Sequence, residues 1–451
     1  MTAAAVSVAS IPRAPLVSGL PLIGSAVEMA RDTLGLCLSA YQRYGPIFRV
    51  RVPGREITVL AGPEANVFLA REAEEILRSR ETWLPFVRQF GAERNLLSED
   101  GDLHSRLRRL MKRTHARSMA APHVGMLSGV VRRQAGALPI GRRLQVIAAL
   151  RPMIAEQLGR LMTGRAAPEM TSDLARVNLD ATRVFVVGSR PELVLRLPWY
   201  RRRLRRVLAL GDAVLAEHRR GPRDPANPDL VDDLLAAAAA DPALFSEGDL
   251  RLGAIGPFIA GLDTVANGCT FLLYELLSHP EVRARVVEEA DAFFARGDMT
   301  IDALRSLRTL HLVAMETLRL HPVAPAMLRT AARDFTFAGH AVREGAPVLV
   351  ANAVSHFLPS LWTRPSEFDP GRFEDGRSEH RKAGAYAPYG LGPHTCLGAG
   401  LAEVQMALIV ASLLHEVELQ IDPPGYVLRT VQAPGPTADR RFGMKVVRRR
   451  R

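Results

Sequence analysis

The feature that most restricts how this chain can fold is a long apolar stretch, Leu252 to Leu277, just past its middle. The stretch is long enough to span a membrane, yet it contains Pro257, Asp263, Asn267 and Glu275. Such polar side chains are costly in lipid, so we expect a helix buried inside the protein, and its polar residues suit the wall of an active site. Pro257 removes a helical hydrogen bond, which predicts a kink or a late start of the helix there.

Helical patterns dominate the rest of the chain, and strands are few and short. Helical spacing runs through 64–80, 103–118, 148–162, 174–187, 201–219, 248–278, 281–295, 301–320 and 397–415. Short strands are expected at 335–337, 347–354, 427–430 and 443–447, and a hairpin at 47–52 and 57–61 around Pro53-Gly54. No repeat or linker interrupts the sequence, so we predict a mainly α protein with a small β region. Residues 1–451 then form a single domain, with residues 1–20 as a flexible leader.

Composition narrows the setting of the protein. With 451 residues, 47% of them hydrophobic, the chain can bury a large core. Its three cysteines, Cys37, Cys269 and Cys396, are irregularly spaced, which argues against a disulfide framework or a zinc cluster and favours a reducing cytoplasm. Residues 1–10 lack the basic start of a secretory signal, and no anchor-length run precedes 31–49, so no transmembrane segment is expected.

The net charge of +12 raises the question of a polyanionic partner, and the chain ends in a run of arginines, 448–451. Lysine occurs only at Lys112, Lys382 and Lys445, so nearly all the positive charge is arginine. The codon bias of a GC-rich bacterial genome produces this composition without selection for a partner. We therefore expect no nucleic-acid binding, and strongly salt-dependent affinity for DNA would contradict this.

The residue in the most informative environment is Cys396, in the segment Pro-Tyr-Gly-Leu-Gly-Pro-His-Thr-Cys-Leu-Gly at 388–398. It lies directly before an apolar helix, where free N–H groups and the helix dipole stabilise a thiolate. Gly390, Gly392 and Gly398 permit unusual backbone angles and the close approach of a flat ligand. A thiolate here can bind iron, and the plain alternative is a buried free cysteine, which is the usual state of a lone cysteine.

This segment is similar to the haem-binding loop of the cytochrome P450 superfamily, whose pattern is Phe-x-x-Gly-x-x-x-Cys-x-Gly. Tyr389 stands at the Phe position, where its phenol could add a hydrogen bond that tunes the iron. Matching features run from about Pro12 to the C-terminus. The resemblance implies a triangular single domain in which Cys396 binds the iron and Gly398 lies against the haem. Because no Cys-x-x-Cys-His occurs, the haem is expected to be non-covalent haem b.

A second part of the resemblance concerns charged residues near the end of a helix. Glu316 and Arg319 are three residues apart, and Arg372 lies in a Phe-Asp-Pro-Gly-Arg-Phe segment similar to the meander of the family. Alone, the first two would form an exposed pair worth ~0.2–0.5 kcal/mol. The resemblance instead implies a buried network of all three that supports the fold beneath the haem, and losing one member would cost roughly 3–5 kcal/mol.

On the central helix, the Ala-Gly-Leu-Asp-Thr segment at 260–264 resembles the oxygen-activation motif of the family. The resemblance implies that Ala260 and Gly261 leave room above the iron. It also implies that Asp263 and Thr264 are the catalytic residues that relay protons to bound O2, as cleavage of the O–O bond requires. Without that context, a threonine in a helix usually bonds back to a carbonyl of the preceding turn.

Haem propionates need cationic or hydrogen-bonding partners. His104 and Arg108, one turn apart, match the propionate-binding helix of the family, and Arg329 and His394 occupy the two other expected places. Each of the four alone could be an ordinary surface residue. Together and in this order they indicate a haem site.

The resemblance also implies separate electron donors, because no flavin or iron–sulfur domain is appended. Electrons would come from NAD(P)H through a reductase and a ferredoxin or flavodoxin. A basic helix carries Arg106, Arg109, Lys112, Arg113 and Arg117, which could steer such acidic partners; an ordinary solvated helix face explains it equally well.

By analogy with the family, the substrate is expected to touch the loop 82–97, the segments 195–200 and 323–327, and the turn 433–437. In the first and third of these, the residues expected to line the pocket are Trp83, Leu84, Phe86, Val323 and Met327. They favour a hydrophobic small molecule of terpenoid, steroid, fatty-acyl or polyketide-like type, as in secondary metabolism. The long segment between Pro280 and Glu316 points the same way. Residues 193–204 either cap the pocket or touch a membrane surface, so we expect a cytoplasmic monomer for which loose membrane association stays open.

Two hypotheses compete with an O2-dependent monooxygenase. The first is a peroxide-driven peroxygenase or a haem-thiolate isomerase, which the intact Asp263-Thr264 pair disfavours. The second is a non-catalytic haem carrier or sensor, which the relay motif and an apolar pocket disfavour. Failure to consume NADPH with any substrate in a coupled assay would revive the second hypothesis.

Overall fold

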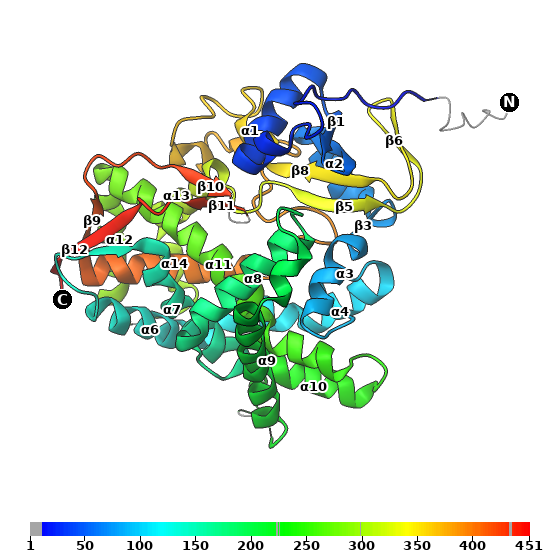
Figure 1. Ribbon diagram of the computed structural model, residues 1–451. Helices are drawn as coiled ribbons and strands as arrows, with labels where there is room; N and C mark the ends of the chain where they lie inside the picture. Colours follow the sequence, from blue (N-terminus) through cyan, green and yellow to red (C-terminus); the bar gives the residue numbers. More distant parts are fainter. Residues whose placement is uncertain (1–10, 222–223, 225, 298, 433–434) are drawn as a thin grey trace.

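The computed structural model describes residues 11–221, 224, 226–297, 299–432 and 435–451, and helices make up most of it (Figure 1). The α-helices are α1 (Ala26–Tyr44), α2 (Gly62–Arg71), α3 (Arg80–Gln89), α4 (Gly101–His115), α5 (Arg117–Ala120), α6 (Val124–Gly136), α7 (Val146–Leu158), α8 (Thr171–Phe185), α9 (Pro198–His218), α10 (Leu230–Ala240), α11 (Glu247–Ser278), α12 (Pro280–Ala295), α13 (Arg308–Leu320) and α14 (Ala399–Glu416). The prediction of a mainly α protein with a small β region is confirmed.

The strands form four small sheets. They are β1 (Ile47–Val52), β2 (Arg55–Ala61), β3 (Leu77–Arg78), β4 (Arg143–Gln145), β5 (Met327–Ala331), β6 (Phe335–Phe337), β7 (His340–Val342), β8 (Pro347–Ala351), β9 (Val417–Asp422), β10 (Thr430–Gln432), β11 (Pro436–Ala438) and β12 (Gly443–Arg449). The largest sheet has the order β1-β2-β8-β5-β3. It contains the predicted hairpin and, through the parallel pairing of β2 with β8, joins the blue N-terminal strands to the yellow ones in Figure 1.

The central helix is present as α11, and 22 of its side chains are buried. It begins with a capping box, in which the Ser246 hydroxyl accepts from the Asp249 N–H and the Asp249 carboxylate accepts from the Ser246 N–H. The helix continues through Pro257 to Ser278, so the predicted late start is wrong. Contacts with α7, α9, α13 and α14 stabilise the segment, although Pro257 supplies no N–H. A kink at this proline stays a prediction.

Two predicted helices are shorter than the sequence indicated. The helix expected over 64–80 ends at Arg71, because the chain then forms β3, which pairs with β5. The helix expected over 301–320 begins only after Leu307, whose ψ of 52° is not helical. In both cases the apolar spacing continues across a break that long-range packing imposes.

The strand predictions also shift at their ends. The strand expected over 347–354 ends at Ala351, where a 3₁₀ turn begins, and the one expected over 427–430 begins only at Thr430. Four helices were not foreseen, namely α1, α3, α6 and α10. Of these, α3 matters most for the site, because it replaces the first half of the loop expected over 82–97 and contains Pro85.

Within the described part of the chain, α14 is the one helix long and apolar enough to cross a membrane. The protein buries 72% of that helix, as it does for core helices of this composition. The arginine tail is also held by the fold, since Arg450 pairs with Asp291 at 2.9 Å and Arg448 with Glu418 at 2.6 Å. Part of the positive charge of the tail is therefore neutralised within the chain.

Candidate functional site

Cys396 lies shortly before α14 in a loop whose backbone is tightly fixed. Its N–H donates to the carbonyl oxygen of Tyr389 at 2.9 Å. Gly390 and Gly392 both have a φ of 74°, and a Cβ at Gly392 would lie 2.3 Å from a carbonyl oxygen of α2. These two positions require glycine, as predicted. Gly398 has a φ of −88°, so the prediction of unusual backbone angles is wrong for that residue.

The Cys396 thiol is accessible to solvent, yet it lies deep among protein atoms. This loss of water raises the pKa of the thiol, and the Gly398 N–H together with the charge of Arg108 offsets only part of that effect. The helix terminus therefore favours the thiolate, as expected, but does not outweigh the effect of burial on the pKa. A metal cation bound here would favour the thiolate further, because it deprotonates a coordinating thiol.

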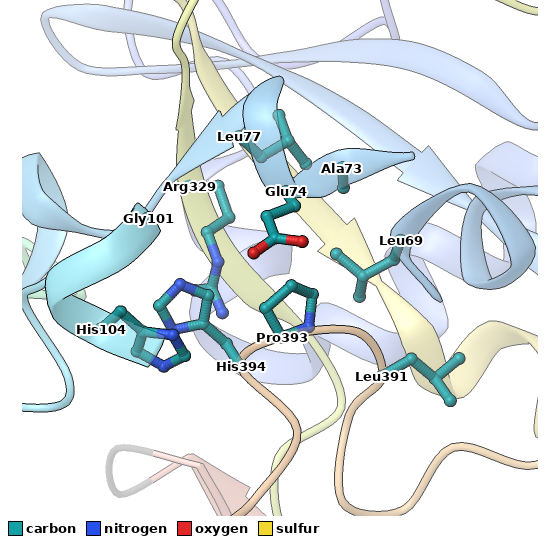
Figure 2. A pocket seen from close by; sticks show the side chains of 10 residues that line it. All are labelled: Leu69, Ala73, Glu74, Leu77, Gly101, His104, Arg329, Leu391, Pro393 and His394. Carbon is teal, nitrogen blue, oxygen red and sulfur yellow. The ribbon is translucent and has the colours of Figure 1, made fainter. Parts of the chain in front are cut away.

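The four basic residues predicted near the haem lie close to the Cys396 loop. The rings of His104 and His394 are 4.0 Å apart between centroids, and both line a pocket together with Arg329 (Figure 2). Arg108 donates to the carbonyl oxygen of Thr395 at 2.7 Å. Thus α4, β5 and the loop before α14, which are far apart in sequence, bring these donors together.

Arg329 is the member of this group that most needs an anionic partner. It is 6% exposed and donates to the carbonyl oxygen of Leu328 at 2.8 Å, while its other contact is the Met327 sulfur at 3.8 Å. Burial lowers its pKa to about 10, against the opposing effect of Asp100. Among the described residues no carboxylate pairs with it, although Glu74 lines the same pocket in Figure 2. Because a buried unpaired cation is costly, this pocket suits a carboxylate-bearing ligand.

The two histidines of the pocket, His104 and His394, lie in different surroundings. His394 Nε2 lies 3.0 Å from Asp100 Oδ1, and Asp100 also accepts from the Ser79 N–H. Burial would raise the pKa of Asp100, but these hydrogen bonds outweigh it and lower the pKa. Burial, aided by His394 and Arg108, lowers the pKa of His104 to about 4, so His104 offers an N–H rather than a charge. The sequence analysis missed Asp100, whose position before a helix was the available signal.

One face of α11 is accessible although the helix is otherwise buried. Between Asp249 and Leu277, the exposed residues are Ala260 and Thr264, one turn apart. The Thr264 hydroxyl donates to the carbonyl oxygen of Ala260 at 2.7 Å. Gly261 is not part of this stripe, because a Cβ there would lie 3.1 Å from a side-chain atom of Leu158 on α7. Its small size therefore serves helix packing.

Asp263 faces a different neighbour from Thr264. Its Oδ1 accepts from Arg151 Nε of α7 at 2.8 Å, and both side chains are partly exposed, 28% for Arg151 and 21% for Asp263. The fold therefore sets the carboxylate on one side of the stripe, held by an arginine that the sequence analysis missed. Since successive residues of a helix point about 100° apart, the hydroxyl and the carboxylate face different directions.

The predicted network of Glu316, Arg319 and Arg372 is present, and all three side chains are 0% exposed. Arg319 donates to both carboxylate oxygens of Glu316, at 2.7 and 2.8 Å, and Arg372 Nε donates to Glu316 Oε1 at 3.0 Å. Glu379, which the sequence analysis missed, accepts from Arg372 Nη1 at 3.3 Å. Two buried guanidinium groups thus face two carboxylates, and their remaining donors bind backbone carbonyls.

The extra hydrogen bond considered for Tyr389 is absent. Its hydroxyl is buried and has no hydrogen-bond partner among the described residues. Burial also raises the pKa of the phenol, so the group stays neutral. An unpaired buried hydroxyl costs about 1–3 kcal/mol, which a phenylalanine at this position would avoid.

The segments expected to contact substrate only partly meet. Gly435, in the predicted turn 433–437, lies against Val323, since a Cβ on it would be 2.7 Å from the Val323 carbonyl oxygen. Residues 433–434 of that turn lie outside the described residues. Phe86 is 2% exposed and packs on Phe90 at 5.2 Å, so it belongs to the core rather than to an open pocket wall. Trp83, Leu84 and Met327 are partly exposed.

Comparison with known families gives a match over most of the second half of the chain and part of the first. The family described as Cytochrome P450 matches residues 153–435, more than half of the chain. The chain belongs to the cytochrome P450 family. P450s are haem-dependent monooxygenases, so haem as the cofactor, O2 as the oxidant and a redox partner follow from membership.

Related proteins and structures agree with this assignment. A Mycobacterium tuberculosis protein provisionally named cytochrome P450 136 is 27% identical over 422 residues, covering 91% of this chain and 83% of that one. A Mycobacterium bovis protein provisionally named cytochrome P450 135B1 is 29% identical over 431 residues, covering 91% and 85%. The fold matches a cyanobacterial P450 solved with retinoic acid bound, with a TM-score of 0.82 and 23% identity over 97% of this chain and 99% of that one. It also matches the haem domain of cytochrome P450DA, with a TM-score of 0.84 and 22% identity over 98% of each chain.

Proposed function

We propose that this P450 uses O2 to oxidise a hydrophobic small molecule, with Cys396 as the residue that would bind the iron of a non-covalent haem b. The observation that carries the proposal is the set of donors around the Cys396 loop. Arg329 is buried and pairs with no carboxylate of the described residues, and His104, Arg108 and His394 lie beside it, as a ligand with two carboxylates requires. Haem bound there supplies the iron at which O2 is activated.

The loop residues complete this cofactor site. The Cys396 sulfur is accessible, and Gly398 next to it is free of side-chain bulk. The backbone carbonyl oxygen of Tyr389 accepts from the Cys396 N–H, so the Tyr389 backbone helps to fix the position of Cys396. We propose that Tyr389 and Gly398 act on the haem through this geometry rather than through a hydrogen bond from the phenol.

The accessible stripe of α11 would supply the proton-handling groups to a bound haem. Thr264 holds a proton at Oγ1, and Ala260 keeps the stripe open next to it; Gly261 acts indirectly by letting α7 approach. Asp263 exchanges protons with solvent, and Arg151 fixes the direction of its carboxylate. The two catalytic groups therefore face different directions, and we propose that a water molecule links them.

The substrate is proposed to be apolar, of terpenoid, steroid, fatty-acyl or polyketide-like type, and the reaction to belong to secondary metabolism. The partly exposed Trp83, Leu84 and Met327 support this, and a structural neighbour was solved with the largely apolar retinoic acid. We further propose that residues 1–451 act as one domain and one monomer in the cytoplasm. A main hydrophobic cluster that draws on helices from α3 to α14 supports the single domain, and three free cysteines support the cytoplasm.

Electrons are proposed to come from NAD(P)H through a reductase and a ferredoxin or flavodoxin. Part of the basic helix is already engaged, because Arg106 pairs with Asp241 and Arg113 with Asp233. Arg109, Lys112 and Arg117 are exposed, and no acidic side chain among the described residues pairs with them. These three form the proposed docking charge for an acidic partner.

The proposal is tested by the visible spectrum of the dithionite-reduced protein under carbon monoxide. We expect a red-shifted thiolate-type Soret band that is lost in Cys396→Ala. Titration of the ferric protein with terpenoid, steroid and fatty-acid panels should then give a low-to-high-spin shift with one class. Bound haem with only a histidine- or thiol-type band would contradict thiolate ligation and favour a non-catalytic haem-binding protein. Product formation with peroxide alone, at the rate of the reconstituted system, would favour a peroxygenase.

A further inference from the structure

We propose that this protein binds the surface of anionic lipid bilayers through one apolar patch ringed by arginines. The starting observation is the distribution of exposed large hydrophobic side chains. Among the described residues, three short segments contain all of them except Ile140. These patch residues are Leu20, Leu22, Ile23, Val27, Val187, Leu193, Leu197, Trp199, Val427 and Val431. Scattered apolar residues need no explanation, but a gathering of this kind marks an interaction site.

The three segments adjoin one another in space. The first turn lies against β1, because a Cβ on Gly24 would be 2.2 Å from the Arg51 carbonyl oxygen. The connection between α8 and α9 reaches the same hairpin, since a Cβ on Gly188 would be 3.3 Å from Arg55 Nη2. The third segment includes β10, which contacts α1, the helix that follows the turn at residues 20–24. The hairpin β1–β2 and α1 therefore bring the apolar residues to one region of the surface.

The turn at residues 20–24 exposes the side chain of Leu22 to solvent. Leu22 is 95% exposed and has a φ of 66°, a left-handed angle that a bulky residue rarely adopts. Reciprocal backbone hydrogen bonds between Leu20 and Gly24, at 3.0 and 2.8 Å, fix the turn. Asparagine or glycine would suit this angle better, so Leu22 combines backbone strain with exposure of an apolar side chain. Strain of this kind points to a function for the side chain.

Positive charge surrounds the apolar residues. At the hairpin, Glu56 is shared by Arg13, Arg49 and Arg51, which leaves positive charge in excess. Near α9, Arg203 lies over the Trp199 ring at 5.6 Å. Further exposed arginines there, which no described acidic side chain pairs with, are Arg196, Arg201, Arg202 and Arg205. Apolar tips within a ring of arginines complement an anionic lipid surface, where leucine and tryptophan enter the acyl boundary and arginine meets phosphate.

The test is co-sedimentation of the full-length holoprotein with vesicles of phosphatidylcholine alone or mixed with phosphatidylglycerol. We expect binding to the mixed vesicles that weakens with salt, and little binding to phosphatidylcholine alone. Leu22→Asn and Leu193→Asn should each weaken partition roughly tenfold, because each removes one apolar side chain from the buried contact. Arg201→Gln and Arg202→Gln should each weaken it about fivefold. The control is Ile140→Asn, which removes an apolar residue that is 51% exposed and lies outside the patch, and it should leave partition unchanged.

Leu22→Asn also separates the lipid role from a structural one. Asparagine tolerates a φ of 66°, so the variant should be at least as stable to urea as the parent protein while binding lipid less well. Trp199 supplies a second signal, since its emission should shift to the blue with mixed vesicles and the shift should vanish in Trp199→Tyr. Equal binding by parent, Leu22→Asn and Ile140→Asn proteins would overturn the proposal. So would a concentration-dependent dimer, seen by sedimentation velocity, that Leu22→Asn abolishes, because the patch would then be covered by a second copy.

Discussion

Replacing Glu316 by glutamine should destabilise the protein far more than the loss of an ordinary ion pair. Arg319 and Arg372 are both fully buried, and both donate to the Glu316 carboxylate. Glutamine keeps the size of the side chain but removes the charge, so two guanidinium groups face only the Glu379 carboxylate. Breaking a buried pair in this way costs roughly 3–5 kcal/mol. That is a large share of the roughly 5–15 kcal/mol by which proteins of this kind are stable.

Urea unfolding followed by circular dichroism measures this loss, with haem retention recorded in parallel. The chain offers a matched control in Asp302 and Arg305, which are also an acid and an arginine three residues apart, but are 78% and 81% exposed. Asp302→Asn should cost less than about 1 kcal/mol, because water and salt screen such a pair. A loss in Glu316→Gln that is no larger than the loss in Asp302→Asn would refute the reasoning, since it would mean that the buried arginines do not need the carboxylate.

Three further outcomes follow from the contacts of single residues. Arg151→Ala should divert reducing equivalents from product to peroxide, because Asp263 loses the group that orients it; an unchanged product-to-peroxide ratio, with Arg160→Ala as the comparison, would count against that role. Gly392→Ala should cost more stability than Gly339→Ala in urea melts. Both positions have a positive φ, which costs an alanine about 1–3 kcal/mol. At Gly392 the Cβ would also lie 2.3 Å from a carbonyl oxygen, whereas no described atom lies within 4 Å of a Cβ at Gly339. Burial lowers the pKa of His218, but the hydrogen bond to Asp229 outweighs this effect and raises the pKa above its usual 6.5. Protonated His218 therefore adds stability at low pH, and this stability is lost as the pH rises through the raised pKa. His218→Gln should flatten that part of the pH profile, and a profile identical to that of the parent protein would show that the pair does not titrate in this range.

The sequence predicted the central helix and the glycine positions before Cys396 well, because both depend on local patterns. The apolar stretch with sparse polar residues became α11, and the glycines before Cys396 have the backbone angles that only glycine adopts easily. The late start of the helix that Pro257 predicted is wrong. The missing hydrogen bond of this proline is a local cost of about 3 kcal/mol, and burial of α11 on several sides compensates for it.

Helix boundaries were harder to predict where tertiary contacts decide them. The apolar spacing of 64–80 fits a helix throughout, but β3 pairs with β5, which lies some 250 residues later in the chain, and this pairing ends the helix at Arg71. No local pattern carries that information. The same holds for α3, which contains Pro85 and lies where the analogy with the family placed a loop.

By itself, the sequence determined which residue types stand in which local pattern: Cys396 before a helix, Glu316 three residues from Arg319, and an alcohol next to an acid on an apolar helix. The tertiary structure alone decided which groups those residues meet. It set Asp100 against His394, Arg151 against Asp263 and Glu379 against Arg372, all pairs from different elements. Within the part of the chain that the structure describes, it also left Arg329 without a carboxylate partner and gathered ten exposed apolar side chains into one region. The reason is physical, because charge pairing, burial and exposure depend on distances across the whole fold, which a one-dimensional pattern does not contain.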